Sequence, residues 1–242
     1  MPDAMQASFD GQPPRSDLRS AAMQQQLQHG GTLVELANHA PVYAQGDPAR
    51  HIYQVEEGCV CICNYEEEGR RLIHAFHFAG DVFGFEANDH HMNSAEAICP
   101  ARLLCCEVRK LTQAWGENPS GALAFWQWRS AQQDRMLERL SHIAHLDGIG
   151  RVLFFLADLA RRTGPSRRIE LSMSRYDIAD YLGLSSETVS RIFTRLKRRG
   201  MIAIIGHCIT IKADWTLAIL SANGPLAWQQ LDDERRTSSA VA

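Results

Sequence analysis

The segment from Ser174 to Lys212 constrains the fold most strongly, because it holds two helix starts, two glycine stops and an alternating run in quick succession. The first helical pattern, SRYDIADYLG, opens with the Ser-x-x-Asp spacing of a capping box and stops at Gly183. The second, SSETVSRIFTRLKRRG, starts after Ser185 as its N-cap and stops at Gly200. The run MIAIIGHCITIK then alternates around a glycine, as a β-hairpin does. Two short helices, a tight turn and a hairpin in this order predict a winged helix-turn-helix.

The second helix of this pair carries one acid at the front of a basic segment. Its apolar face consists of Val189, Ile192, Phe193 and Leu196. With that face turned inward, the side chains that project from the N-terminal turns are Ser186, Glu187, Ser190 and Arg191. In helix-turn-helix proteins these turns enter the major groove of DNA. There Glu187 can accept from the exocyclic amine of cytosine, and Arg191 can donate twice to guanine. We therefore expect these four residues to read base edges.

Other polar and basic residues of the two helices are predicted to contact phosphates, which position a protein without specifying sequence. This set is Ser174, Arg175, Thr188, Arg195, Lys197 and Arg198. From Gly150 to Lys212 there are 12 Lys or Arg against 5 Asp or Glu, a net charge of +7, whereas the rest of the chain carries −10. This asymmetry favours a polyanionic partner at one end of the molecule. The same basic pattern also fits a helix that is merely solvated.

Base contacts of about 1 to 3 kcal/mol each must together supply the roughly 4 to 10 kcal/mol that separates specific from random DNA. One reading helix is marginal for this purpose and two are sufficient. The energetics therefore favour a dimer on palindromic double-stranded DNA.

Upstream, from about residue 40 to 110, turn signals recur every 11 or 12 residues, at Gly46-Asp47, Gly58, Gly69 and Gly80-Asp81. Short runs rich in Val, Ile, Phe and Tyr lie between them. This texture predicts an antiparallel β-sandwich or barrel.

A long helix is predicted from Pro119 to about His145, where neither Gly nor Pro occurs after Gly121. A seam with 4-3-4-3-4 spacing runs along it: Trp126, Ser130, Gln133, Leu137, Leu140 and Ala144. Such a seam suits packing against a second copy of the helix, and Trp126, Gln133, Leu137, Leu140 and Ala144 are the predicted dimer contacts. A helix packed only on its own barrel is the alternative. A shorter helix, GIGRVLFFLADLARRTG, should follow and end at Gly164-Pro165.

The chain should therefore be an α+β protein of several parts. We predict a flexible lead-in (1–30), a β-barrel (31–118), a dimerisation helix (119–146), a winged helix-turn-helix (147–222) and a tail (223–242). No apolar run of 18 residues and no basic, apolar N-terminus is present, so neither a membrane span nor a signal peptide is indicated, and we expect a cytoplasmic protein. The seven cysteines are an odd number and are expected to be reduced thiols. No phosphate loop, HExxH, nucleophile elbow or complete zinc spacing occurs, which argues against an enzyme, a cofactor and a metal.

The order of barrel, long helix and MSRYDIADYLGLSSETVSRIFTRLKRRGMI resembles the CRP/FNR superfamily of bacterial transcription regulators, over about residues 30 to 220. The combination of Glu187, Ser190 and Arg191 is similar to the reading head of the FNR/FixK type. The resemblance implies a jelly-roll barrel like that of cyclic-nucleotide-binding proteins and a homodimer formed by the long helix. It also implies a TTGA-like inverted repeat as target and action on RNA polymerase at promoters, with oxygen- or redox-linked gene control.

Two departures from the family narrow the resemblance. In AGDVFGFEANDHHMNSAEA, Asn93 precedes Ser94 where the cyclic AMP pocket needs arginine, and Phe85 stands where it needs glutamate, with Glu86 one place late. A phosphate without a guanidinium lacks its strongest partner, so cyclic AMP is not expected. No cysteine precedes Cys59, and only Cys106 matches a ligand of the FNR iron-sulfur cluster, which needs four. The resemblance is thus to the cluster-free, FixK-like branch.

Alternation along a strand places Cys59, Cys61 and Cys63 on one face, so a redox or metal role competes with packing as small core hydrophobes. Together with Cys106 they form the redox candidates. His90 and His91 are expected to decorate a loop. A regulator whose barrel binds a small ligand, haem or metal, or is switched by cysteine oxidation, stays open as an alternative.

Overall fold

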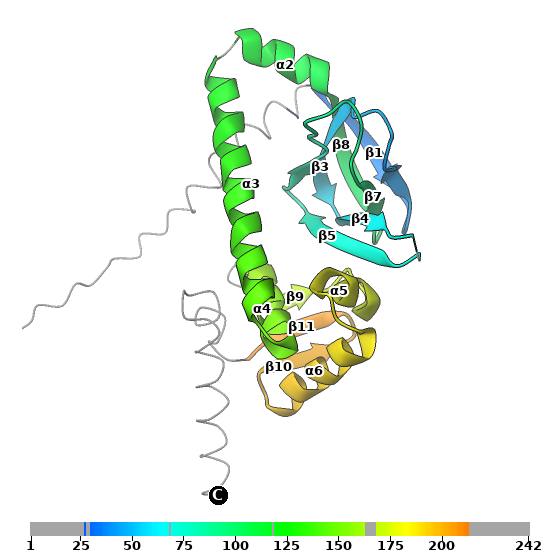
Figure 1. The fold of residues 1–242 in the computed structure, drawn as a ribbon, viewed down its shortest axis with the longest axis vertical. Helices are drawn as coiled ribbons and strands as arrows, with labels where there is room; N and C mark the ends of the chain where they lie inside the picture. Colours follow the sequence, from blue (N-terminus) through cyan, green and yellow to red (C-terminus); the bar gives the residue numbers. More distant parts are fainter. Residues whose placement is uncertain (1–26, 28–29, 68, 118, 163–167, 213–242) are drawn as a thin grey trace, which may run out of the picture.

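The computed structural model describes residue 27 and residues 30–67, 69–117, 119–162 and 168–212 (Figure 1). The predicted tail, the last residues of the winged domain (213–222) and nearly all of the lead-in lie outside the described residues. The predicted glycine-proline stop at 164–165 also lies outside them.

The N-terminal part of the chain folds into two facing antiparallel sheets. One sheet has the order β1-β8-β3-β6 and the other β2-β7-β4-β5. The strands are β1 (Thr32–Leu36), β2 (Pro41–Tyr43), β3 (His51–Glu57), β4 (Cys59–Tyr65), β5 (Arg71–Phe78), β6 (Val82–Phe83), β7 (Ser94–Ala97) and β8 (Ala101–Glu107). The prediction of an α+β chain with a jelly-roll-like barrel is confirmed.

A glycine turn between β3 and β4 is dictated by geometry. Gly58 has a φ of 86°, a conformation that side chains rarely adopt, and a Cβ there would lie 2.4 Å from the carbonyl oxygen of Pro100. The turn signal read from the sequence therefore has a physical cause at this position. It lets β4 begin directly after β3 and cross to the other sheet.

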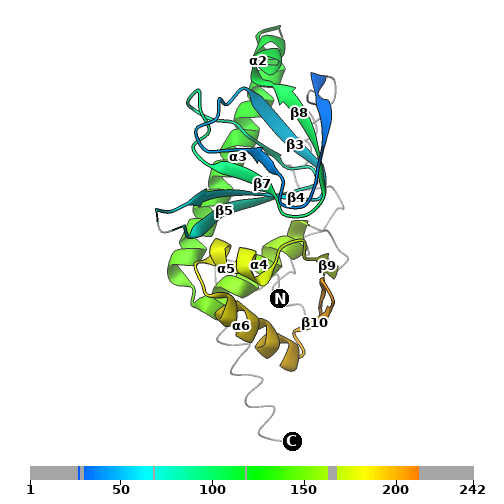
Figure 2. The same cartoon turned by 90° about the vertical axis from the view of Figure 1, so that its right-hand side faces the viewer.

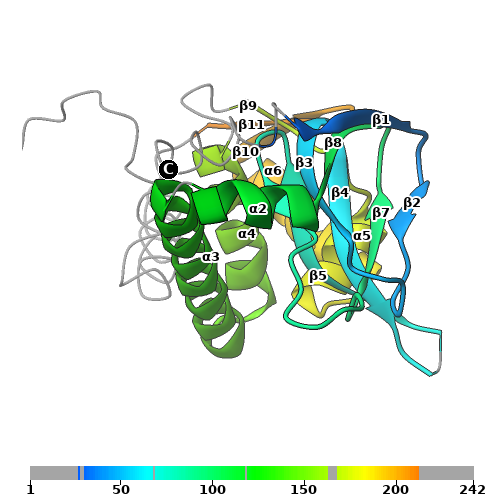
Figure 3. The same cartoon turned by 90° about the horizontal axis from the view of Figure 1, so that it is seen from above.

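Helices α2 (Val108–Glu117) and α3 (Pro119–His145) connect the barrel to the C-terminal part, followed by α4 (Gly148–Arg162). Figure 3 shows α2 leading from the sheets to α3, which runs along the side of the barrel. Helix α2 was not predicted and occupies the end of the segment assigned to the barrel. Its Leu111 is buried in a cluster with Trp128 of α3, and the fully buried Leu27, from the supposed lead-in, joins the same cluster.

The C-terminal part is the predicted winged helix-turn-helix. It contains β9 (Arg168–Glu170), α5 (Arg175–Leu182), α6 (Ser186–Arg198), β10 (Ile202–Ile205) and β11 (Cys208–Ile211), with a sheet order β10-β11-β9. The capping box at the start of α5 is present: the Ser174 hydroxyl accepts from the N–H of Asp177 at 3.2 Å, and the Asp177 carboxylate accepts from the N–H of Ser174 at 2.8 Å. Gly183 ends α5 with a φ of 64°. The predicted inward face of α6 is buried.

One hydrophobic cluster joins the two parts. It contains barrel side chains from β4 and β5 and the cores of α4, α5 and α6. Figure 2 shows β5 above α4 and α5, with α6 on the side of the winged domain away from the barrel. The described part of the chain therefore leaves α6 accessible to an external partner.

Candidate nucleic-acid interface

The N-terminal turns of α6 present the predicted base-reading side chains to solvent. Ser185 caps the helix by accepting from the N–H of Thr188 at 3.1 Å, which fixes where the first turn begins. Glu187, Ser190 and Arg191 are exposed, and Ser186 is half-buried. Among the described residues, the side chains of Glu187 and Arg191 make no hydrogen bond or ion pair. These groups are available to a ligand that approaches α6 from outside.

The charged residues of α6 are placed so that they interact favourably with the helix dipole, in addition to their predicted contacts with DNA. Glu187 lies in the first turn, and Arg195, Lys197 and Arg198 lie in the last. An acid at the N-terminus and bases at the C-terminus each stabilise a helix by about 0.3 to 1 kcal/mol. The same arrangement that presents an acceptor beside Arg191 therefore also stabilises the helix itself.

The predicted phosphate contacts fall into two groups. Lys197 and Arg198 are exposed, and Arg195 is half-buried. The hydroxyl groups of Ser174 and Thr188 already have partners, at 2.7 Å on Asp177 and 2.8 Å on Ser185 respectively. A hydroxyl has both donor and acceptor capacity, so a phosphate at these helix starts would share it with the cap.

Arg175 has a packing role in the structure. Its guanidinium carbon lies 3.7 Å from the ring centroid of Phe193, so the side chain stacks between α5 and α6. Burial lowers the pKa of Arg175. This cation–π contact holds the two helices of the motif together, a role that the sequence pattern did not indicate.

The seam of α3 is open. Its predicted contact residues Trp126, Gln133, Leu137, Leu140 and Ala144 are all exposed. Five of the eleven large hydrophobic side chains exposed in the described part of the chain lie on this helix, including Leu123 (60%) and Met136 (62%), which were not predicted. Leu123 extends the 4-3 spacing by one position. On the opposite side of α3, Trp128 is buried against Phe85 of the barrel and packs beside Phe125 of the same helix. Helix α3 thus has a barrel-facing side and an apolar side that the described residues leave exposed.

The cysteine candidates separate into two places. Cys59, Cys61 and Cys63 are fully buried in the cluster that joins the barrel to the winged domain. Cys106 is buried in a different cluster, beside Leu27 and Trp128. Burial raises the pKa of the Cys59 and Cys106 thiols, which disfavours the reactive thiolate. The four do not form one redox site, although Glu96, which was not predicted, lies beside Cys61 and Cys63.

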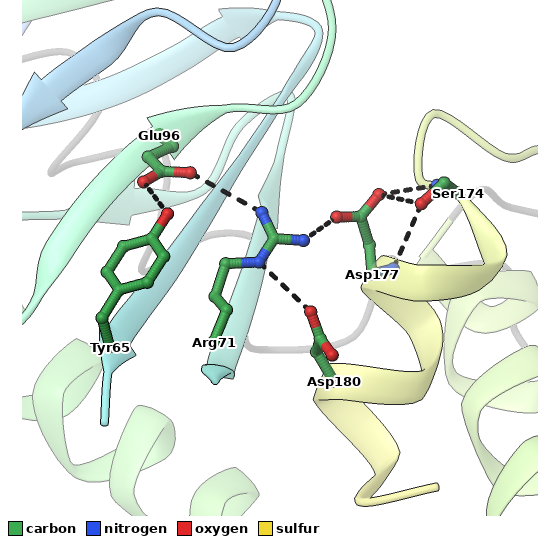
Figure 4. A network of polar contacts seen from close by, with 6 residues as sticks. All are labelled: Tyr65, Arg71, Glu96, Ser174, Asp177 and Asp180. Atoms are coloured by element: carbon green, nitrogen blue, oxygen red, sulfur yellow. Dashed lines mark hydrogen bonds and ion pairs between the residues drawn. The ribbon is translucent and has the colours of Figure 1, made fainter. Parts of the chain in front are cut away.

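An ion-pair network connects the barrel to the first helix of the DNA-binding motif (Figure 4). Arg71 of β5 contacts the carboxylates of Asp177 and Asp180 on α5, the latter at 3.2 Å, and that of Glu96 on β7 at 3.6 Å. Glu96 also accepts a 2.7 Å hydrogen bond from the hydroxyl of Tyr65. Since Asp177 is the capping-box residue, the barrel contacts α5 at the residue that organises its first turn.

The region that corresponds to a cyclic nucleotide pocket is occupied by protein contacts. Phe85 packs against Phe125 at a ring distance of 4.7 Å. Glu86 lies 3.4 Å from His91, and the hydroxyl of Ser94 accepts from the N–H of Gln45 at 3.0 Å. The expectation that His91 decorates a loop was wrong: it is 3% exposed and stacks on Tyr43 at 3.5 Å, because a flat imidazole fills the space over the tyrosine ring.

Comparison with known proteins agrees with this architecture. The Crp-like helix-turn-helix domain matches residues 150–216, and the cyclic nucleotide-binding domain matches residues 33–118. Together the two matches cover more than half of the chain. The chain belongs to the CRP/FNR family of transcription regulators.

Within the family the chain is similar to the nitrogen fixation regulation proteins FixK. It is 37% identical to that of Azorhizobium caulinodans over 179 residues, which cover 72% of each chain. It is 42% identical to that of Rhizobium meliloti over 163 residues, 67% of this chain and 74% of the relative. The structure of FixK2 from Bradyrhizobium japonicum has a TM-score of 0.75 and 32% identity, covering 79% of this chain and 98% of that one.

The resemblance to the FixK-like branch is therefore confirmed. The fumarate and nitrate reduction regulatory protein of Escherichia coli is less similar, with 29% identity over 190 residues, 75% of each chain. These relatives are transcription regulators rather than enzymes. In the described part of the chain, every helix is too short or too polar to cross a membrane.

Proposed function

We propose that the protein binds a TTGA-like inverted repeat as a homodimer and regulates transcription through RNA polymerase at the bound promoters. The observation that carries this proposal is the set of exposed side chains on the N-terminal turns of α6, with Glu187 and Arg191 one helical turn apart. In a major groove, Glu187 accepts from cytosine and Arg191 donates to guanine, so that the two read one G·C step of each half-site. Ser186 and Ser190 contact neighbouring base edges.

Phosphate contacts come from the remaining polar groups of the motif. Lys197 and Arg198 supply exposed charge at the end of α6, and Arg195 lies between them and the reading turns. Ser174 and Thr188, at the starts of α5 and α6, approach the phosphate backbone of the DNA. Arg175 contributes by fixing α5 against α6, and its exposed edge adds positive charge near the backbone.

The second copy binds through the seam of α3. Exposed Trp126, Leu137 and Leu140 are supported as contacts by their spacing and by the burial of the opposite side of the helix. Gln133 and Ala144 complete the seam, and Leu123 extends it. In such a dimer, an inverted repeat with half-sites one turn of DNA apart requires the two α6 helices to lie about 34 Å from each other.

The relatives' names concern nitrogen fixation and fumarate and nitrate reduction, and on that basis we propose that the regulated genes respond to oxygen or redox state. DNA binding by purified protein tests the central claim. At about physiological salt, a TTGA palindrome should bind at least about 1,000-fold more tightly than a scrambled duplex of the same length and composition. Equal affinity for the two duplexes would overturn the proposal.

Binding to a duplex with only one half-site tests the homodimer independently of base reading. Loss of most of the affinity on the half-site indicates that both helices contribute. Undiminished affinity on the half-site would contradict the homodimer while leaving base reading intact.

A further inference from the structure

Three potential metal ligands converge in the barrel wall that faces the winged domain. Cys61 and Cys63 alternate along β4 and so point to the same side of the sheet. Glu96 of β7 stands directly opposite Cys61 in the antiparallel pairing. The two Sγ atoms and a carboxylate oxygen all lie within 4.8 Å of one another.

This spacing is close to what a small cation requires. Two Zn–S bonds of about 2.3 Å at a tetrahedral angle separate the sulfur atoms by roughly 3.8 Å. The donors therefore need to close by about 1 Å or less, within the reach of side-chain rotation. A register shift in the pairing of β4 with β5 occurs between Ile62 and Cys63, and such irregularities re-aim side chains.

The carboxylate is held in place from both sides. One oxygen of Glu96 accepts from the hydroxyl of Tyr65 at 2.7 Å, and the other lies 3.6 Å from the guanidinium of Arg71. Outer partners of this kind orient metal ligands in known sites.

The local charge favours a cation. Around Arg71 stand the carboxylates of Glu96, Asp177 and Asp180, so this network carries a net charge of −2 while the thiols are protonated. A divalent ion that displaces two thiol protons leaves that net charge unchanged.

We propose that Cys61, Cys63 and Glu96 bind one Zn²⁺ ion per chain, with the fourth position taken by water. Two thiolates and one carboxylate suit zinc, whereas a site for Cu⁺ would make little use of the carboxylate. Binding releases two protons, one from each thiol, and involves no change of oxidation state. Glu96 is about one-fifth exposed, which gives the fourth position access to solvent.

Cys59 provides a matched internal control. It lies on the same strand and is also fully buried, but it is not part of the donor cluster. Replacing it by serine therefore introduces the same chemical change and a similar burial penalty as Cys61→Ser or Cys63→Ser. Glu96→Gln is the gentler variant, because it keeps the side-chain shape and lies at a partly exposed position.

The experiment uses the full chain, reduced and stripped of metal, titrated with Zn²⁺ against a chromophoric chelator. The parent and Cys59→Ser should bind one tight equivalent. Cys61→Ser and Cys63→Ser should lose at least about 100-fold in affinity, since even outer-shell changes cost 10- to 100-fold. Glu96→Gln should weaken binding by at least about tenfold. Co²⁺ should give a sulfur-to-cobalt absorption band in the parent that is absent from both cysteine variants.

Four results would refute the zinc site. The first is parent protein that does not compete with the chelator, and the second is zinc binding that is equal in Cys59→Ser, Cys61→Ser and Cys63→Ser. The third is Cu⁺ binding that is tight and insensitive to Glu96→Gln, which would indicate a two-thiolate site for a monovalent ion. The fourth result is unchanged zinc affinity in Glu96→Gln. This variant tests the proposal by itself if circular dichroism shows that a cysteine variant does not fold.

Discussion

Replacing Arg71 by methionine removes a guanidinium but keeps an unbranched side chain that can fill the same space. In the structure, this guanidinium is the cation that contacts Asp177, Asp180 and Glu96 together. Its loss leaves three carboxylates near one another at the contact between the barrel and α5. We expect Arg71→Met to lower the free energy of unfolding.

The magnitude follows from how buried each partner is. Removing one member of a fully buried ion pair costs about 3 to 5 kcal/mol, because the other charge is left without compensation. Only Asp177, with a side chain 7% exposed, approaches that limit, and it keeps its hydrogen bonds from Ser174. Asp180 is 30% exposed and can recover water. The expected cost is therefore about 2 kcal/mol, below the range for a fully buried pair.

Urea unfolding at neutral pH and fixed protein concentration measures this difference, with Arg70→Met as the control. Arg70 is the neighbouring residue, and its side chain is 73% exposed in a surface pair with Glu66. Its replacement should cost less than about 1 kcal/mol. The concentration must be fixed because association of copies contributes to apparent stability.

A second substitution tests the electrostatic cause. Asp180→Asn in the Arg71→Met background removes one of the stranded carboxylates and should recover part of the lost stability. In the parent, the same substitution should be destabilising, so the two effects differ in sign. If Arg71→Met proves as stable as Arg70→Met, the network does not hold α5 to the barrel and the reasoning fails.

Three further predictions concern the reading helix, the seam and pH. Glu187→Ala should reduce the preference for TTGA over other sequences. Arg198→Ala should weaken binding to specific and random DNA alike and lower the salt dependence of binding by about one ion, with both variants measured by fluorescence anisotropy. An unchanged base preference in Glu187→Ala would show that this residue does not read bases. Leu137→Glu should shift the protein from dimer to monomer in analytical ultracentrifugation without loss of helix content. The control Gln132→Glu, which lies off the seam, should leave the association state unchanged. A Leu137→Glu dimer as tight as that of the parent would contradict the seam as the dimer contact. Burial tends to raise the pKa of Asp177, but hydrogen bonds from its cap and from the guanidinium outweigh it, so that the pKa is lowered. A carboxyl with a depressed pKa in the folded state stabilises the fold above its unfolded pKa of about 3.9 and loses this contribution as pH falls further. Thermal unfolding of the parent should therefore drop more steeply below about pH 4 than that of Arg71→Met, and parallel curves would refute this.

The parts of the fold that were predicted depend on local signals. The capping box at Ser174, the stop at Gly183 and the buried face of α6 each involve residues within a few positions of one another. The seam of α3 repeats at six positions from Trp126 to Ala144, so a mismatch at one position does not hide it. These features need only the geometry of a helix and the chemistry of its ends.

Helix α2 and Leu27 were missed for a different reason. Helix α2 (Val108–Glu117) is only ten residues long and begins directly after β8 ends at Glu107, with no glycine or proline between them to mark a boundary in the sequence. Leu27 lies in a polar segment, and it is buried only because the cluster of Ile52, Cys106 and Trp128 accepts it. The burial of Leu111 and of Leu27 depends on residues that are distant in sequence, so a short window of the sequence does not reveal it.

In the candidate site, too, some features follow from local sequence and others depend on tertiary packing. Which side chains of α6 face outward follows from its own periodicity, and so the exposure of Glu187, Ser190 and Arg191 was predicted. The stacking of Arg175 on Phe193 depends on the angle between α5 and α6. The contact of Arg71 with Asp177, 106 positions away, depends on how the barrel packs against the winged domain. Cys61 and Cys63 were identified by alternation, but their role was undecided because Glu96 reaches them only through the pairing of β4 with β7. A donor set split between strands that are distant in sequence cannot be read from spacing. Its chemistry becomes visible only when the register of the sheet is known, and the zinc titration therefore tests an inference that the sequence alone did not permit.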